Sequence, residues 1–243
     1  MLTTRTRITL ISAAVAAAAA TGVTCNAFAG QSSSGASAAP SSSAAPCRAD
    51  STTLVGRLDG DAYPDKITDP DHKGRKMTVQ WGTKDGSYGE PQSVNKLLGV
   101  RKNEIGTVAV ADFKNTGRLD MVVGVVEPSP YDDPNPQRVA EFRAGPVDRE
   151  LHSAHTTRSD LGKEGEAHAL QIADYNGDKY PDLAISDYAG DGQTARSVRL
   201  SRPDGGLGTS DPDANRKYGE ESAKPDWPAL PHDGWAHFYK PCS

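Results

Sequence analysis

Short stretches of alternating apolar and polar residues run along this chain, separated by turn-forming residues. Residues 77–89, 138–150 and 197–208 each contain one alternating run followed by a polar turn, as half-buried β-strands do. No stretch longer than about ten residues keeps a helical period. Residues 160–168 are too rich in glycine to favour a helix. The pattern predicts an all-β fold of short strands.

Three segments align without gaps and indicate an internal repeat. They are VGRLDGDAYPDKIT at 55–68, VADFKNTGRLDMVV at 110–123 and IADYNGDKYPDLAI at 172–185. Each has an apolar lead, a polar turn, an aspartate and a second apolar run. The predicted repeat cores lie near 52–89, 106–150 and 168–208, and a closing segment covers 225–243. Within that segment, the alternation in WAHFYK (235–240) predicts a last strand that pairs with Thr53–Leu58.

The third segment resembles the calcium loop of FG-GAP and VCBS-type repeats, which are the blades of integrin-α-like β-propellers. The other two copies are more degenerate, but all three are in register. The resemblance implies a β-propeller-like array of about three blades. Propeller rings typically have four to eight blades. We therefore expect an incomplete or open array, or one that pairs with a second copy of the chain.

The third loop has the oxygen-rich composition of a calcium site. Asp174, Asn176 and Asp178 occupy alternate positions, and Ca²⁺ takes six to eight oxygen ligands. The Tyr180 carbonyl and the Asp182 carboxylate would complete the set, as the resemblance also implies. Three carboxylates within nine residues repel one another without a cation. The alternative is a turn whose Asp and Asn side chains bind their own backbone amides.

The other two loops depart from this pattern by including basic residues. Arg57 takes the first ligand position of the first loop, where a guanidinium would replace the metal ion by pairing with the loop acids. Lys114 and Thr116 interrupt the second loop, and the ammonium would act similarly. The weaker metal candidates in these two loops are Asp59, Asp61, Asp65, Asp112 and Asp120.

The first 46 residues have the composition of an export signal followed by a tether. Arg5 and Arg7 precede an apolar, alanine-rich run, and Ala27-Phe28-Ala29 ends it, which is typical of a signal peptide at 1–29. Residues 30–46 are a disordered Ser/Ala/Gly/Pro linker by composition, so the repeat domain would span 47–243. We expect a secreted protein. The alternative is a cell-surface lipoprotein anchored through Cys25.

Two cysteines remain after the leader, at the ends of the predicted domain. An oxidising compartment permits a bridge between Cys47 and Cys242. In the loop-entropy model it would stabilise the fold by about 5 kcal/mol. Free thiols and a metal-binding pair are the alternatives, although no His/Cys spacing supports a metal.

Charge and hydropathy exclude several classes of protein. The net charge is −5 and the mean hydropathy is −0.60, which is too polar for a multi-span membrane protein and not basic enough to suggest nucleic-acid binding. The leader holds two arginines and no acid, so its removal would change the net charge to −7. The partners we expect are an extracellular protein or glycan, and self-association is also open.

Other candidate residues favour structural roles. His152, His155, Ser153 and Asp160 contain the residue types of a hydrolase triad, but no G-x-S-x-G elbow is present, and an exposed loop is the simpler interpretation. Trp81 alternates with apolar residues and is expected in the core. Trp235 is expected to pack, with sugar stacking as the alternative.

The sequence therefore predicts a calcium-stabilised, non-enzymatic extracellular binding or adhesion module with one calcium ion and no catalytic residues. Two alternatives stay open. One is an exported polysaccharide hydrolase or lyase that uses the acidic loops and Trp235. The other is a purely structural protein of the cell envelope.

Overall fold

The computed structural model describes residues 45–131, 133–135, 137–162, 166–202, 204–222 and 234–243. Several predictions fall outside the described residues. These are the leader with Cys25, residues 30–44 of the linker, and residues 225–233 of the closing segment.

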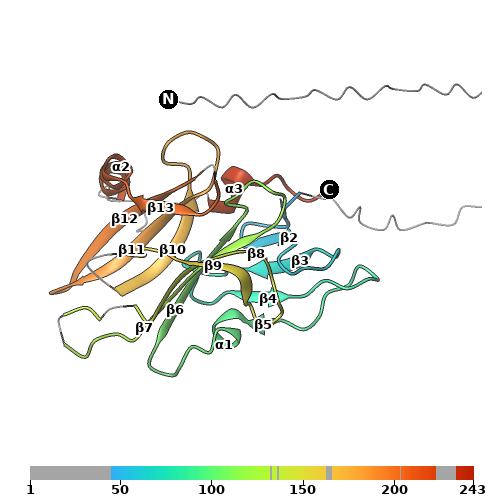
Figure 1. Ribbon diagram of the computed structural model, residues 1–243, viewed down its shortest axis with the longest axis horizontal. Helices are drawn as coiled ribbons and strands as arrows, with labels where there is room; N and C mark the ends of the chain where they lie inside the picture. Colours follow the sequence, from blue (N-terminus) through green and yellow to red (C-terminus); the bar gives the residue numbers. More distant parts are fainter. Residues whose placement is uncertain (1–44, 132, 136, 163–165, 203, 223–233) are drawn as a thin grey trace, which may run out of the picture. The chain divides into compact units, whose positions relative to one another are not determined.

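Three antiparallel sheets follow one another along the chain (Figure 1). In each, strands adjacent in sequence are adjacent in the sheet, and no sheet of the described residues closes into a barrel. The all-β prediction is confirmed. The first sheet consists of β1 (Cys47–Arg48), β2 (Thr53–Gly56), β3 (Asp65–Thr68), β4 (Thr78–Gln80) and β5 (Gln92–Ser93), and is followed by the short helix α1 (Val94–Leu97).

The other two sheets have four strands each, and each predicted repeat core falls in a different sheet. The second sheet consists of β6 (Ile105–Ala111), β7 (Asp120–Val126), β8 (Val139–Val147) and β9 (Ser153–Arg158). The third consists of β10 (Glu166–Ala173), β11 (Asp182–Gly190), β12 (Gln193–Ser201) and β13 (Leu207–Ser210).

The inner strands of the second sheet lie at the centre of the core. Every residue of β7 is buried, and in β6 all but Ile105 are. Leu54 of the first sheet, Val123 of the second and Leu170 of the third belong to one cluster of buried residues. The continuous apolar runs of β6 and β7 therefore reflect burial on both faces of the sheet, where no polar alternation is needed.

The loop between β3 and β4 connects the first sheet to the other two. Val108 of β6 donates its N–H to the Gly74 carbonyl at 2.9 Å, and Leu170 of β10 donates to the Lys73 carbonyl at 3.2 Å. Gly74 has a φ of 69°, and a side chain there would meet the Val108 backbone. Only glycine fits both the conformation and the close approach.

The predicted last strand at 235–240 is wrong, because α3 (Gly234–Phe238) is a helix. Trp235 and Tyr239 are both buried, and the Tyr239 N–H donates to the Trp235 carbonyl at 2.9 Å. Residues four apart share one face of a helix, and in so short a segment they also fit an alternating pattern. The Trp235 indole N–H donates to the Val110 carbonyl at 2.7 Å, so this residue packs into the fold.

The chain end pairs with β1 and not with Thr53–Leu58. Arg48 donates its N–H to the Lys240 carbonyl at 2.8 Å, and Cys242 donates to the Arg48 carbonyl at 3.0 Å. The predicted Cys47–Cys242 disulfide is present. The disulfide joins β1, the first strand of the described fold, to the last residues of the chain.

The helix α2 (Pro212–Ser222) was not expected from the pattern. Its start does carry a signal, since Asp211 precedes a proline and accepts the N–H of Ala214 at 2.8 Å, as an N-cap residue does. Ala214 and Tyr218 are buried with Val198 of β12. None of the helices in the described ranges is long and apolar enough to cross a membrane.

Candidate functional site

The three aspartates that end the repeated loops occupy equivalent positions. Asp65, Asp120 and Asp182 each begin the second long strand of a sheet, and each is at most 1% exposed. Each carboxylate accepts backbone N–H groups from its own loop and from a residue in, or just after, the strand that follows its own. The donors beyond the loop are Gly82 at 2.9 Å, Gly145 at 2.8 Å and Ser201 at 2.9 Å.

These hydrogen bonds join each loop to its sheet. Asp65, for example, also accepts the N–H groups of Leu58 at 2.9 Å and Asp59 at 3.1 Å. Burial raises the pKa of all three carboxyls to about 6, while the backbone donors oppose this rise. The sequence assigned these residues to metal ions, and the geometry adds a bracing role that a sequence pattern does not reveal.

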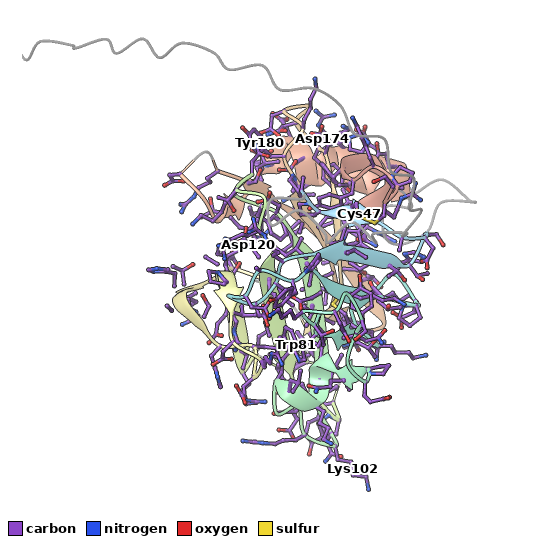
Figure 2. All side chains as sticks on the ribbon, turned by 90° about the vertical axis from the view of Figure 1, so that its right-hand side faces the viewer. Cys47, Trp81, Lys102, Asp120, Asp174 and Tyr180 are labelled. Atoms are coloured by element: carbon purple, nitrogen blue, oxygen red, sulfur yellow. A yellow bond between two sulfur atoms is a disulfide. The ribbon has the colours of Figure 1, made fainter. Side chains whose placement is uncertain are left out.

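The third loop contains the strongest metal candidates, and its polar side chains turn toward the backbone. Asp174 accepts the N–H of Gly177 at 2.7 Å. Asn176 accepts that of Asp178 at 3.0 Å, and Asp178 accepts that of Tyr180 at 2.8 Å. The loop is therefore a turn whose side chains bind its own backbone amides, which the sequence allowed as the alternative to a calcium site. Figure 2 shows Asp174 and Tyr180 in the loop, apart from Asp120.

The donor chemistry of this loop still suits calcium, because each oxygen of Asp174 and Asp178 accepts one hydrogen bond and keeps a free lone pair. Asp182 is the least suitable ligand, since it is fully buried and accepts the N–H groups of Tyr175 and Ser201 as well as the Ser201 hydroxyl. Burial dominates the raised pKa of Asp182, and the negative charges of Asp178 and Asp174 add to it. Within the described ranges, no three acidic, histidine or cysteine side chains are already grouped as a metal site.

Basic side chains approach the acids of the first two loops. In the first loop, the Arg149 guanidinium lies 3.3 Å from both Asp59 and Asp61 and 5.9 Å from the Trp81 ring centre. This loop is salt-bridged by Arg149, which lies 90 positions from Asp59. No local pattern identifies such a partner. The predicted pairing of Arg57 stays a prediction.

In the second loop, Asp112 accepts the N–H groups of Thr116 at 2.8 Å and Gly117 at 2.6 Å. The positive charge of Lys114 acts to lower the pKa of Asp120, although burial raises it overall. At the third loop, the Nε2 atom of His237 lies 3.7 Å from Asp174, and this ring is charged only when protonated.

The residues of the possible triad do not converge. The Ser153 hydroxyl donates to the Ala144 carbonyl, and His152 binds Asp148 at 3.2 Å. Asp160 lies 3.4 Å from Arg199. These partners give the set no geometry for nucleophilic catalysis.

A basic run, Lys73, Arg75 and Lys76, was also missed, although three cations within four residues are visible in the sequence. They line a groove of about 520 Å³. No family model matches this chain, and no curated protein sequence matches it. The family resemblance therefore rests on the repeated loops.

Proposed function

We propose that this protein is an exported, non-enzymatic binding or adhesion module of the FG-GAP/VCBS type. Its three sheets would be blades of an incomplete β-propeller, and its third loop would bind one calcium ion. The support is structural equivalence: each sheet is an antiparallel meander. Each has a buried aspartate that joins the loop before its own strand to the chain at or just after the next strand.

Contacts between neighbouring sheets also suit a blade array. The first loop reaches the second sheet, where Val147 donates its N–H to the Leu58 carbonyl at 3.0 Å. Lys114 of the second loop packs against Gly205 beside the third sheet. The first two loops therefore each touch the next sheet in order, as successive blades do in a repeat array.

The observation that carries the calcium proposal is the difference in charge between the loops. Arg149 and Lys114 bring positive charge to the first two loops. Lys179 of the third loop forms no ion pair within the described residues, and there the acids Asp174 and Asp178 act to raise the pKa of Asp182. A divalent cation would relieve this repulsion and would stabilise the folded state, since the unfolded chain has no assembled loop.

A thermal melt with calcium or with a chelator tests the proposal. Calcium at 100 times its Kd would stabilise the fold by about 2.7 kcal/mol. For a domain of this size, that corresponds to a rise of about 5 to 10 °C in Tm. Asp178→Asn should abolish the rise. Asp61→Asn, at the equivalent position of the first loop, should leave it intact.

An unchanged Tm at saturating calcium would overturn the calcium proposal. A rise that survives in Asp178→Asn would place the ion elsewhere. Asp182 is avoided in this test, because its removal would also break the hydrogen bonds to Tyr175 and Ser201.

A further inference from the structure

A groove lies between the first two sheets, at the end of β6 opposite to the second acidic loop. One wall is the β3–β4 loop with Lys73, Arg75 and Lys76, and the other is Asn95 with the beginning of β6. The volume of about 520 Å³ is within the usual range for ligand sites. In Figure 2, Lys102 lies near this end of the fold and Asp174 lies at the other.

The backbone of the basic wall is held in place. Gly74 donates its N–H to the buried Asp69 carboxylate at 3.1 Å, and its carbonyl accepts from Val108. The Asn95 amide donates to the Arg75 carbonyl at 2.8 Å. Loop and helix are therefore fixed while the basic side chains extend into solvent.

Positive charge is in excess in the groove, where three basic side chains face two acidic ones. Lys73, Arg75 and Lys76 are exposed, and no ion pair among the described residues involves them. Glu104 also lines the groove, but its carboxylate is already paired. It accepts a hydrogen bond from the Arg138 guanidinium at 2.7 Å and one from the Arg101 backbone N–H at 2.8 Å. Asp71 is the other acid of the lining.

Three exposed cations lie close in sequence to the lining residues Asn95 and Glu104, and one of them, Arg101, pairs with Glu104 at 3.9 Å. They are Lys96, Arg101 and Lys102. Such a concentration of positive charge on a chain with a net charge of −5 attracts anions and raises their local concentration.

We propose that this groove binds an acidic polysaccharide that carries carboxylate or sulfate groups. The inference rests on the proposed function as a binding module and names the ligand class. Arg75 would bind an oxyanion through its planar guanidinium, and the two lysines would act as point charges. Asp71 and the Asn95 carbonyl oxygen would accept hydrogen bonds from sugar hydroxyl groups.

The composition of the groove argues against two other anionic partners, single-stranded nucleic acid and an inserted membrane surface. No aromatic side chain lines it, so single-stranded nucleic acid would lack the stacking surface it needs. The exposed large hydrophobic residues among those described are Tyr88, Tyr131 and Tyr180. None of them lines the groove, so nothing there would insert into a membrane.

Direct binding measurements with the full secreted chain test the proposal. The probes are dextran sulfate for sulfate, alginate for carboxylate and dextran as the neutral control, with duplex DNA and anionic vesicles as competing classes. The triple variant Lys73→Gln, Arg75→Gln and Lys76→Gln should bind the acidic glycans at least tenfold more weakly. The control triple Lys84→Gln, Arg158→Gln and Lys240→Gln, with the same change of charge on exposed residues, should change binding less than twofold.

Dextran sulfate and alginate together distinguish the two anionic groups, and binding to either supports the proposal. Equal weakening by both triples, or stronger binding to DNA or vesicles, would overturn it. Absence of glycan binding would also overturn it. The calcium melt, measured on the same variants, shows separately whether the proposed function fails as well.

Discussion

Removing the Cys47–Cys242 disulfide should destabilise the protein mainly through its unfolded state. The two cysteines are 195 positions apart, and cross-linking a loop of that length corresponds to about 5 kcal/mol at 25 °C in the loop-entropy model. The folded state has other contacts at this point. Trp235 binds the Val110 carbonyl, and the Asp112 N–H donates to the Tyr239 hydroxyl at 2.7 Å. We therefore expect Cys47→Ser/Cys242→Ser to fold with a lower free energy of unfolding.

Urea unfolding followed by circular dichroism measures this difference. The double variant should show a lower midpoint and a larger m-value, because the unlinked chain exposes more surface when unfolded. Wild-type protein in reductant is the matched control and should behave like the variant. A loss of less than about 1 kcal/mol with an unchanged m-value would refute the loop-entropy argument. A variant without folded structure would refute the claim that the other contacts hold the chain end.

Two further substitutions test buried and exposed charges. Burial raises the pKa of Asp69 to about 7, so its contribution to stability is complete below about pH 4 and is lost as the pH rises through 7, by up to about 4 kcal/mol. Asp69→Asn should flatten this part of the curve of unfolding free energy against pH, and an unchanged slope would contradict the assignment. Arg149→Gln should cost about 1 kcal/mol at low salt, because its ion pairs with Asp59 and Asp61 are partly exposed. A double-mutant cycle with Asp61→Asn should show coupling that weakens in 1 M salt, and no coupling at low salt would refute the pairing.

The strand pattern and the repeated loops carried most of the information available in the sequence. Alternation predicted an all-β chain, and the three aligned segments fall in three separate sheets. The position of cysteines at the two ends of the domain predicted the disulfide. These features are local, or depend on a single pairing, and so are visible without coordinates.

Short segments were less predictable where two periodicities coincide. Trp235 and Tyr239 fit both an alternating strand and one face of a short helix, and contacts with Val110 and Asp112 select the helix. Helix α2 was missed because the pattern around Ala214 and Tyr218 is weak. The Asp-Pro pair at its start indicated the helix better than the periodicity of its apolar residues did.

The sequence by itself determined the composition of the acidic loops, and the tertiary structure decided how their charges are arranged. Asp65, Asp120 and Asp182 are calcium-type residues by pattern, yet distant backbone N–H groups occupy their oxygens. Arg149 reaches the first loop from the turn between β8 and β9, and the basic groove forms where the β3–β4 loop meets β6. Electrostatic interactions depend on distance in space, and residues far apart in the chain become neighbours only when the sheets pack.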